Sequence, residues 1–195
     1  MSVVIKDGRG TGQEAQVDDH GRLYVLSNNV SHVQHHALYH QDLFVVFFTT
    51  TLPDTNETPC AFFKNTTGDL DMEVFLIDVG TSAASTIRFY FDAEYTSGGE
   101  VVTPLNTNRG SGNNLSIDQA EVYQGGAAGD LALDTTEQKQ WDQAYTSGPD
   151  KLSFDLDGGL ILSPGTSAHM TAQGAADDVV TLSAFVTSHP SGTRL

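Results

Sequence analysis

Cysteine is almost missing from this sequence, since Cys60 is the only one in 195 residues. A single cysteine excludes an internal disulfide bond and a cluster of thiolate metal ligands, and it fits synthesis in a reducing compartment. We therefore expect Cys60 to be a buried, unreactive thiol.

Long apolar runs are missing as well. No segment approaches the roughly 20 apolar residues of a membrane-spanning helix. The N-terminus also lacks the charged region followed by an apolar run that marks a secretory signal. The sequence therefore predicts a soluble protein without a secretory signal.

Basic residues are scarce. The chain has nine Lys and Arg against 25 Asp and Glu, which gives a formal net charge of −16. Such a surface repels phosphate backbones and anionic lipids, so we expect no nucleic-acid partner and no membrane partner. Three of the nine cations, Lys6, Arg9 and Arg22, lie near the N-terminus. That segment is the least acidic part of the chain and suits electrostatic docking on an acidic partner.

The usual catalytic and phosphate-binding motifs are absent. Gly8-x-Gly10-x-Gly12 lacks the GxGxxG spacing of a dinucleotide site, no phosphate-loop lysine follows a strand, and no GxSxG motif presents a serine nucleophile. The sequence does not exclude a pair of carboxylates placed for glycoside hydrolysis, because the separation of two carboxylates depends on the fold. We predict that the chain is not an enzyme. A carbohydrate-active or metal-dependent enzyme is the remaining alternative.

Histidine is concentrated in one short segment that holds His32, His35, His36 and His40. His32 with His36, and His36 with His40, would share one face of a helix. The metalloprotease motif HExxH needs a glutamate after its first histidine, and Val33 stands there. His32, His36 and His40 are therefore weak metal candidates, and a pH-sensitive contact suits them equally well.

Two Asp-x-Asp pairs resemble the start of a calcium-binding loop. Asp69 with Asp71 and Asp155 with Asp157 have the spacing, but neither pair is followed by the further ligands that such a loop needs. We interpret them as solvent-facing strand residues. The sequence predicts no metal and no cofactor.

What the sequence does contain is a glycine-rich N-terminal segment, residues 4–26. Its glycines leave no side chain between the backbone and a neighbouring surface, and the segment has few apolar groups to offset the entropy lost on ordering. We expect an arm that becomes ordered against a partner, with residues 15–26 forming a hairpin that ties it to the body. The expected partner-binding residues are Lys6, Asp7, Gly8, Arg9, Gly10, Gly12 and Arg22.

The rest of the chain alternates short β-type runs with turn residues. In one of these runs, Ile87, Phe89 and Phe91 are expected on one face of a strand and Arg88, Tyr90 and Asp92 on the other. Residues 65–68 predict a hairpin between strands 60–64 and 70–79, and residues 131–145 are the plausible helical segment outside the histidine-rich region. Strands are predicted at residues 43–51, 60–64, 70–79, 85–95, 152–156, 160–162 together with 168–172, and 179–187.

This succession predicts an all-β fold, a β-sandwich or jelly roll with little helix. We expect an N-terminal arm and hairpin over residues 1–30 and a β-sandwich body over residues 31–195.

Several segments resemble virion structural proteins of tailed bacteriophages. The opening IKDGRGTGQEAQVDDHGRL has the same succession of Lys-Asp-Gly, spaced glycines, Ala-x-Val-Asp and Arg-Leu. NETPCAFFKNTTGDLDMEV, TPLNTNRGS and LILSPGTSAHMTAQG are similar to the bodies of such proteins. The resemblance implies a structural role without catalytic residues. Proteins of this size in that class resemble capsid decoration or cement proteins, so it also implies a homotrimer that binds other virion proteins such as the major capsid protein. The implied location is the virion, after assembly in the host cytoplasm.

A tail, baseplate or fibre component that binds a host receptor or glycan is the first alternative. Its candidate surface contacts are Trp141, Tyr145, Asp142 and the Asn-rich loop 106–114 with Asn106 and Asn108, because aromatic rings beside amides and carboxylates suit a sugar. Loop packing at a subunit interface is the simpler explanation of the same residues.

Overall fold

A computed structural model of the chain describes residues 16–17, 23–24, 43–108, 115, 119–125 and 130–190. The chain divides into two compact units, Met1–Ser31 and His32–Leu195. In the first unit, β1 (Gln16–Val17) pairs antiparallel with β2 (Leu23–Tyr24), within the range expected for a hairpin. The arm residues 6–12, Arg22 and the histidine cluster at positions 32–40 lie outside the described residues.

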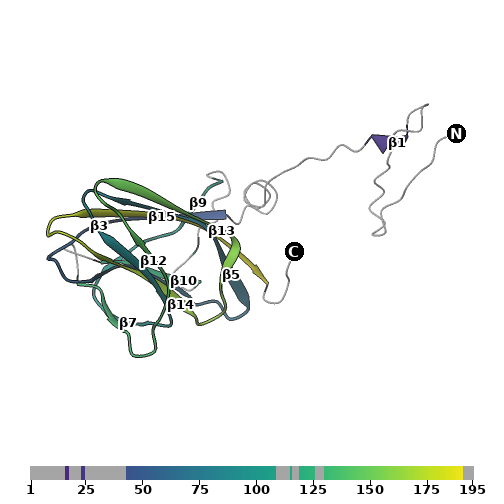
Figure 1. The fold of residues 1–195 in the computed structure, drawn as a ribbon. Helices are drawn as coiled ribbons and strands as arrows, with labels where there is room; N and C mark the ends of the chain where they lie inside the picture. Colours follow the sequence, from purple (N-terminus) through teal and green to yellow (C-terminus); the bar gives the residue numbers. More distant parts are fainter. Residues whose placement is uncertain are drawn as a thin grey trace. The chain divides into compact units, whose positions relative to one another are not determined.

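The described part of the second unit consists of strands and turns and contains no helix (Figure 1). This confirms the all-β prediction. Accordingly, none of the described residues belongs to a helix of the length and apolarity needed to cross a membrane. The strands are β3 (Leu43–Thr51), β4 (Thr58–Asn65), β5 (Leu70–Thr81), β6 (Thr86–Phe91), β7 (Glu94–Ser97), β8 (Glu100–Val101), β9 (Leu105–Asn106), β10 (Ala120–Gln124), β11 (Ala132–Asp134), β12 (Lys139–Tyr145), β13 (Asp150–Leu162), β14 (Ser167–Gln173) and β15 (Val179–Pro190).

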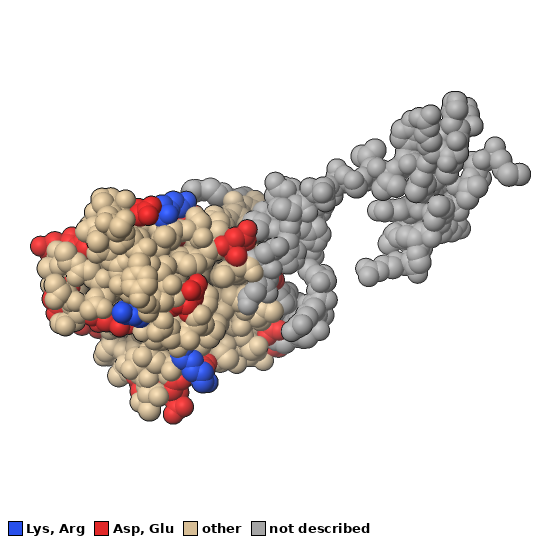
Figure 2. Space-filling view, viewed as in Figure 1, with Lys and Arg blue, Asp and Glu red and all other residues tan. Residues whose placement is uncertain are grey.

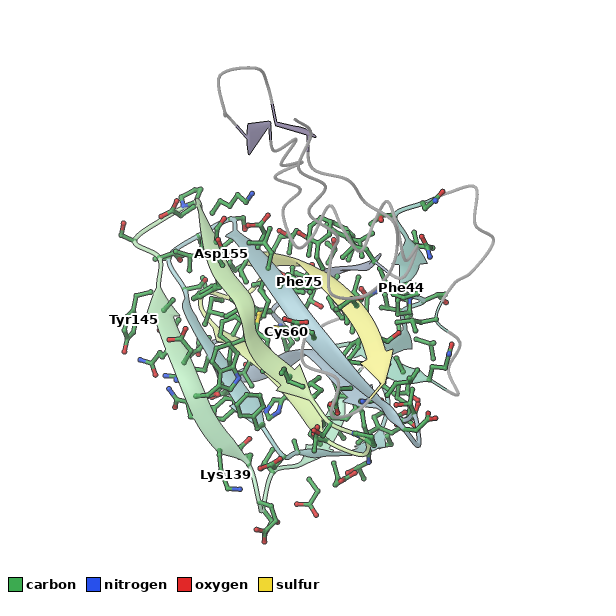
Figure 3. The ribbon with its side chains drawn as sticks, turned by 90° about the vertical axis from the view of Figure 1, so that its right-hand side faces the viewer. Phe44, Cys60, Phe75, Lys139, Tyr145 and Asp155 are labelled. Atoms are coloured by element: carbon green, nitrogen blue, oxygen red, sulfur yellow. The ribbon has the colours of Figure 1, made fainter. Side chains whose placement is uncertain are left out.

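These strands form antiparallel sheets. One sheet has five strands in the order β13-β5-β15-β3-β9, and another has six in the order β12-β6-β14-β4-β10-β8. A separate two-stranded sheet joins β11 to β7. Figure 3 looks onto the five-stranded sheet, with Asp155 on β13, Phe75 on β5 and Phe44 on β3.

One hydrophobic core receives side chains from both large sheets. Val46 and Val79 come from the five-stranded sheet, Ile87 and Met170 come from the six-stranded sheet, and all four are at most 2% exposed. The predicted alternation is confirmed within β6, because Ile87 and Phe89 are buried in the core while Arg88 is half-buried on the other face. It does not extend to Asp92, which follows the end of β6 and has a positive φ of 62°. Burial of these apolar groups is the main favourable contribution to folding.

The hairpin expected between strands 60–64 and 70–79 is wrong. β4 belongs to the six-stranded sheet and β5 to the five-stranded sheet, so the chain crosses from one sheet to the other between them. Asn65 fixes the crossing from a fully buried position. Its Nδ2 donates to the carbonyls of Leu70 and Leu162, both at 2.8 Å, and its Oδ1 accepts from the Thr67 backbone N–H at 3.0 Å. The same residue types that form hairpin turns therefore serve here to connect two sheets.

The helix expected at residues 131–145 is also wrong, because β11 and β12 occupy that range. Asp134 ends β11 by accepting hydrogen bonds from the backbone N–H and hydroxyl of Thr136, at 3.0 and 2.6 Å. The ladder between β12 and β6 shifts register between Gln140 and Asp142, so Trp141 occupies a bulge. Residues 160–162, which we grouped with 168–172, instead continue β13 after a second register shift.

Candidate interaction surfaces

The five-stranded sheet carries an apolar row on the face turned away from the core. Leu105 of β9 pairs with Val45 of β3, Val45 pairs with Phe185 of β15, and Phe185 pairs with Leu76 of β5. Because paired residues point to the same face, these side chains line up across four neighbouring strands. Phe47 lies two residues beyond Val45 on the same face. We call Val45, Phe47, Leu76, Leu105 and Phe185 the apolar row.

Two members of the apolar row are strongly exposed, Phe47 at 61% and Leu105 at 55%. On the side nearest β13, the apolar row is bordered by Asp78. Asp78 forms an ion pair with Lys151 at 3.0 Å and accepts a hydrogen bond from the Ser153 hydroxyl at 2.5 Å. The hydrogen bond from Ser153 and the neighbouring Lys151 lower the pKa of the Asp78 carboxyl. The row is therefore an apolar strip with a charged border. Contiguous exposed apolar groups with polar surroundings are typical of protein interaction sites.

The remaining surface of the body is acidic. Figure 2 shows blue Lys and Arg side chains close to red carboxylates on one face of the body. In the part of the chain that the structure describes, every Lys and Arg is paired with a carboxylate: Lys64 with Glu94 (2.6 Å), Arg88 with Glu57 (3.0 Å), Lys139 with Asp92 (2.9 Å) and Lys151 with Asp78 (3.0 Å). These pairs neutralise the few cations and leave the other carboxylates in excess.

The six-stranded sheet presents a polar network on the face turned away from the core. Glu57, just before β4, accepts hydrogen bonds from the Tyr90 hydroxyl at 2.8 Å, the Thr171 hydroxyl at 2.6 Å and Arg88 Nη1 at 3.0 Å. Arg88 Nε in turn donates to Gln143 Oε1 at 3.1 Å. We call Glu57, Arg88, Tyr90, Gln143 and Thr171 the Glu57 network. Burial, together with the hydrogen bond to the Glu57 carboxylate, raises the pKa of Tyr90.

His169 lies beside this network, on β14. It is the register partner of Tyr90, and the two rings stack with centroids 4.9 Å apart. The imidazole is 3% exposed, and neither ring nitrogen has a hydrogen-bond partner within the described part of the molecule. Burial lowers the pKa of His169 to about 4, against the smaller opposing effect of Glu57. His169 is therefore neutral at pH 7, and the burial of its two unpaired nitrogens lowers the free energy of unfolding.

The structure places Asn106 and Asn108 apart from Trp141 and Tyr145, which are also contacts expected for the receptor-binding alternative. Asn106 is buried on β9, at the edge of the five-stranded sheet, and its Oδ1 accepts the backbone N–H of Asn108 at 2.7 Å. Trp141 and Tyr145 lie on β12, the edge strand of the six-stranded sheet. Trp141 packs inward and Tyr145 is 70% exposed.

Trp141 belongs to the packing of the interior. Its ring lies 5.1 Å from that of Phe89 and 5.5 Å from that of Phe91, between centroids. It also lines an apolar cavity of about 60 Å³ between the two large sheets, together with residues such as Leu160 and Ala184. These contacts favour a packing role for Trp141 over contact with a ligand at the surface.

Sequence reasoning missed the Glu57 network and the apolar row. The alternation of Arg88 and Tyr90 did indicate a polar strand face, but Glu57 and Gln143 reach that face from distant segments. The strand at residues 43–51 was expected, and nothing in its composition indicated that Phe47 would be exposed. No group of three His, Cys, Asp or Glu among the described residues is placed to hold a metal ion. Comparison with protein-family models, with curated proteins and with solved structures found no match.

Proposed function

We propose that this chain is a structural protein of a tailed-bacteriophage virion, which decorates the capsid shell and stabilises it. The observation that most supports this proposal is the apolar row. A body with a solvent-exposed apolar strip beside a charged border has the features of a protein that docks on another protein. The resemblance of residues 5–23 and of the three body segments to virion proteins supports the choice of partner.

The body is, on this proposal, a β-sandwich of the jelly-roll class. The supporting observation is the single core that both large sheets share. Such a body has two opposite faces, so it can bind the shell with one and present the other outward. The apolar row suits the shell-facing side, since complete burial of Phe47 and Leu105 would contribute about 1–2 kcal/mol each, given their present exposure.

The N-terminal arm is a second attachment in this proposal. The cations Lys6, Arg9 and Arg22 would meet an acidic partner surface, and the glycines would allow close backbone approach. An arm and an apolar row that engage together bind more tightly than either alone, because the second contact forms at a high effective concentration. We propose a homotrimer with the major capsid protein as partner, in the virion.

Cosedimentation with particles assembled without this protein tests the proposal. The full chain is expected to cosediment with the particles, and a chain that lacks residues 1–26 is expected to remain folded but lose binding. Binding retained by the truncated chain would contradict the role of the arm. Imaging of the labelled particle distinguishes decoration, with many copies over the shell, from a tail component, with a few copies at one vertex.

The apolar row is tested in the same assay with the double variant Phe47→Ser and Leu105→Ser. The matched control is Val101→Ser on β8 of the other sheet, because Val101 has the same 55% exposure as Leu105. We expect the double variant to lose binding at least tenfold, about 1.4 kcal/mol, and the control to bind as the unchanged chain does. Equal binding by all three proteins would exclude the row as the docking surface.

A further inference from the structure

The six-stranded sheet has a feature that the docking proposal does not use, an exposed tyrosine beside a connected set of polar side chains. Tyr145 ends β12 and is 70% exposed. Figure 3 shows it near one end of β12 at the margin of the body, with Lys139 near the other end. From the register, Tyr145 pairs with Thr86, and Thr86 pairs with Gln173 on β14. The next row of the same face is Gln143, Arg88 and Thr171.

The exposed ring of Tyr145 lies next to the Gln143 side chain. The two residues are two apart and share a face of β12, and the Gln143 side-chain amide contacts the Tyr145 hydroxyl. An exposed tyrosine beside polar side chains offers an apolar ring face together with a polar edge.

The polar groups next to the ring are also held in place. Gln143 Oε1 accepts from Arg88 Nε at 3.1 Å and from Gln140 Nε2 at 3.1 Å. Arg88 Nη1 donates to Glu57 at 3.0 Å and to Gln173 at 3.3 Å. Within the described part of the chain, the hydrogen bonds of Arg88 use Nε and Nη1 and leave Nη2 without one. The Arg88 side chain is 19% exposed and that of Glu57 is 36% exposed. Donors and acceptors that are fixed but not saturated remain available beside the ring.

We propose that this face, formed by Tyr145, Gln143, Arg88, Gln173 and Glu57, binds a neutral saccharide. A sugar has an apolar C–H face that packs on an aromatic ring, and hydroxyl groups that both donate and accept. The ring of Tyr145 would pack against the C–H face, and Arg88 Nη2 and Glu57 would form hydrogen bonds with the hydroxyl groups. Because the polar side chains are already ordered by one another, little side-chain entropy is lost on binding.

The charges on this face and on the whole chain favour neutral sugars over anionic ones. Glu57 neutralises Arg88, so the face has no free cation to attract a carboxylate or sulfate. The chain as a whole has a formal net charge of −16, which repels anionic glycans. We therefore expect a neutral sugar, and neutral hexose and N-acetylhexosamine oligomers are the probes that test it.

Saturation-transfer NMR on the full chain tests the proposal, with hexasaccharides of glucose, mannose, galactose and N-acetylglucosamine as probes and sialyllactose as the anionic comparison. We expect transfer to at least one neutral probe and none to sialyllactose. Calorimetry with the best probe is expected to give at least tenfold weaker binding for Tyr145→Ala, and a change below about threefold for Tyr145→Phe, which keeps the ring.

The matched control is Phe47→Ala, which removes an exposed aromatic ring from the other sheet and is expected to leave sugar binding unchanged. Transfer to none of the four neutral probes, preference for sialyllactose, or unchanged binding by Tyr145→Ala would each overturn the proposal. The assay uses the purified chain without particles, so its outcome is independent of the test for docking on the shell.

Discussion

At the scale of single residues, burial decides what the titratable groups can do. Cys60 was expected to be inert, and it is 1% exposed in the core, where desolvation raises the pKa of its thiol to about 12. A thiol in that state is rarely ionised, so it is a poor nucleophile. His169 is also buried, at 3% exposed, on the opposite face of the sheet, where it has an aromatic neighbour in Tyr90 but no hydrogen-bond partner among the described residues.

His169 makes stability depend on pH. Its pKa is about 4 in the folded protein and 6.5 as an ordinary value, so the unfolded chain takes up the proton first as the pH falls. The stability is complete above pH 6.5 and is lost progressively between pH 6.5 and pH 4. At about 1.4 kcal/mol per pKa unit, the loss reaches about 3 kcal/mol.

Urea unfolding of the native chain and of His169→Phe at pH 7 and pH 4.5 measures this effect. The variant keeps an aromatic ring against Tyr90 and has no group to protonate, so its free energy of unfolding should fall by about 2 kcal/mol less than that of the native chain. Carboxylates that titrate over the same range affect both proteins and cancel in the comparison. Equal losses in the two proteins would show that His169 does not titrate as inferred.

At the scale of elements, connections between strands were harder to predict than strands. The strand at residues 43–51 was predicted with the bounds that β3 has, because β-branched and aromatic residues identify it locally. The partner of a strand is not a local property. Residues 60–64 and 70–79 were predicted to pair with each other, but the register places β4 beside β14 and β10, and β5 beside β13 and β15.

Asn65 should be the residue on which the crossing between β4 and β5 depends. Asn65→Ala leaves the carbonyl of Leu162 and the N–H of Thr67 without their side-chain partner, whereas the carbonyl of Leu70 still accepts from the Thr67 hydroxyl. Since each buried group left unpaired costs about 1–3 kcal/mol, we expect a loss of roughly 3 kcal/mol in the free energy of unfolding, measured by urea denaturation.

The matched control is Asn56→Ala. Asn56 is an exposed asparagine whose side chain bonds only Asp54 within the described residues, at 2.9 Å, so its replacement should cost at most about 0.5 kcal/mol. A comparable loss in both variants would mean that the crossing does not depend on Asn65.

At the scale of the whole molecule, the excess of carboxylates is the dominant electrostatic feature. The net charge of −16 opposes the compact state by self-repulsion. The ion pairs of the described cations are short, at 2.6–3.0 Å, so salt screens the long-range repulsion more than it weakens these pairs.

The melting temperature should therefore rise with salt. Calorimetry from low ionic strength to about 0.3 M NaCl should show an increase of several degrees, as the Debye length falls below about 10 Å. The rise should be smaller in the double variant Asp69→Asn and Glu137→Gln, which removes two exposed carboxylates. A melting temperature that falls with salt would indicate that the ion pairs matter more than the repulsion.

The sequence by itself determined the all-β class, the positions of most strands, the acidic surface and the burial of Cys60. Composition and period-two alternation are local, and they survive in any arrangement of the strands. Only the tertiary structure decided the order of the strands, the interior position of Trp141, and the two surfaces made by the apolar row and by the Glu57 network with Tyr145. Each surface joins side chains from three or more strands that are distant in sequence, and pairing between distant strands is fixed by shared burial of the core and not by any one segment.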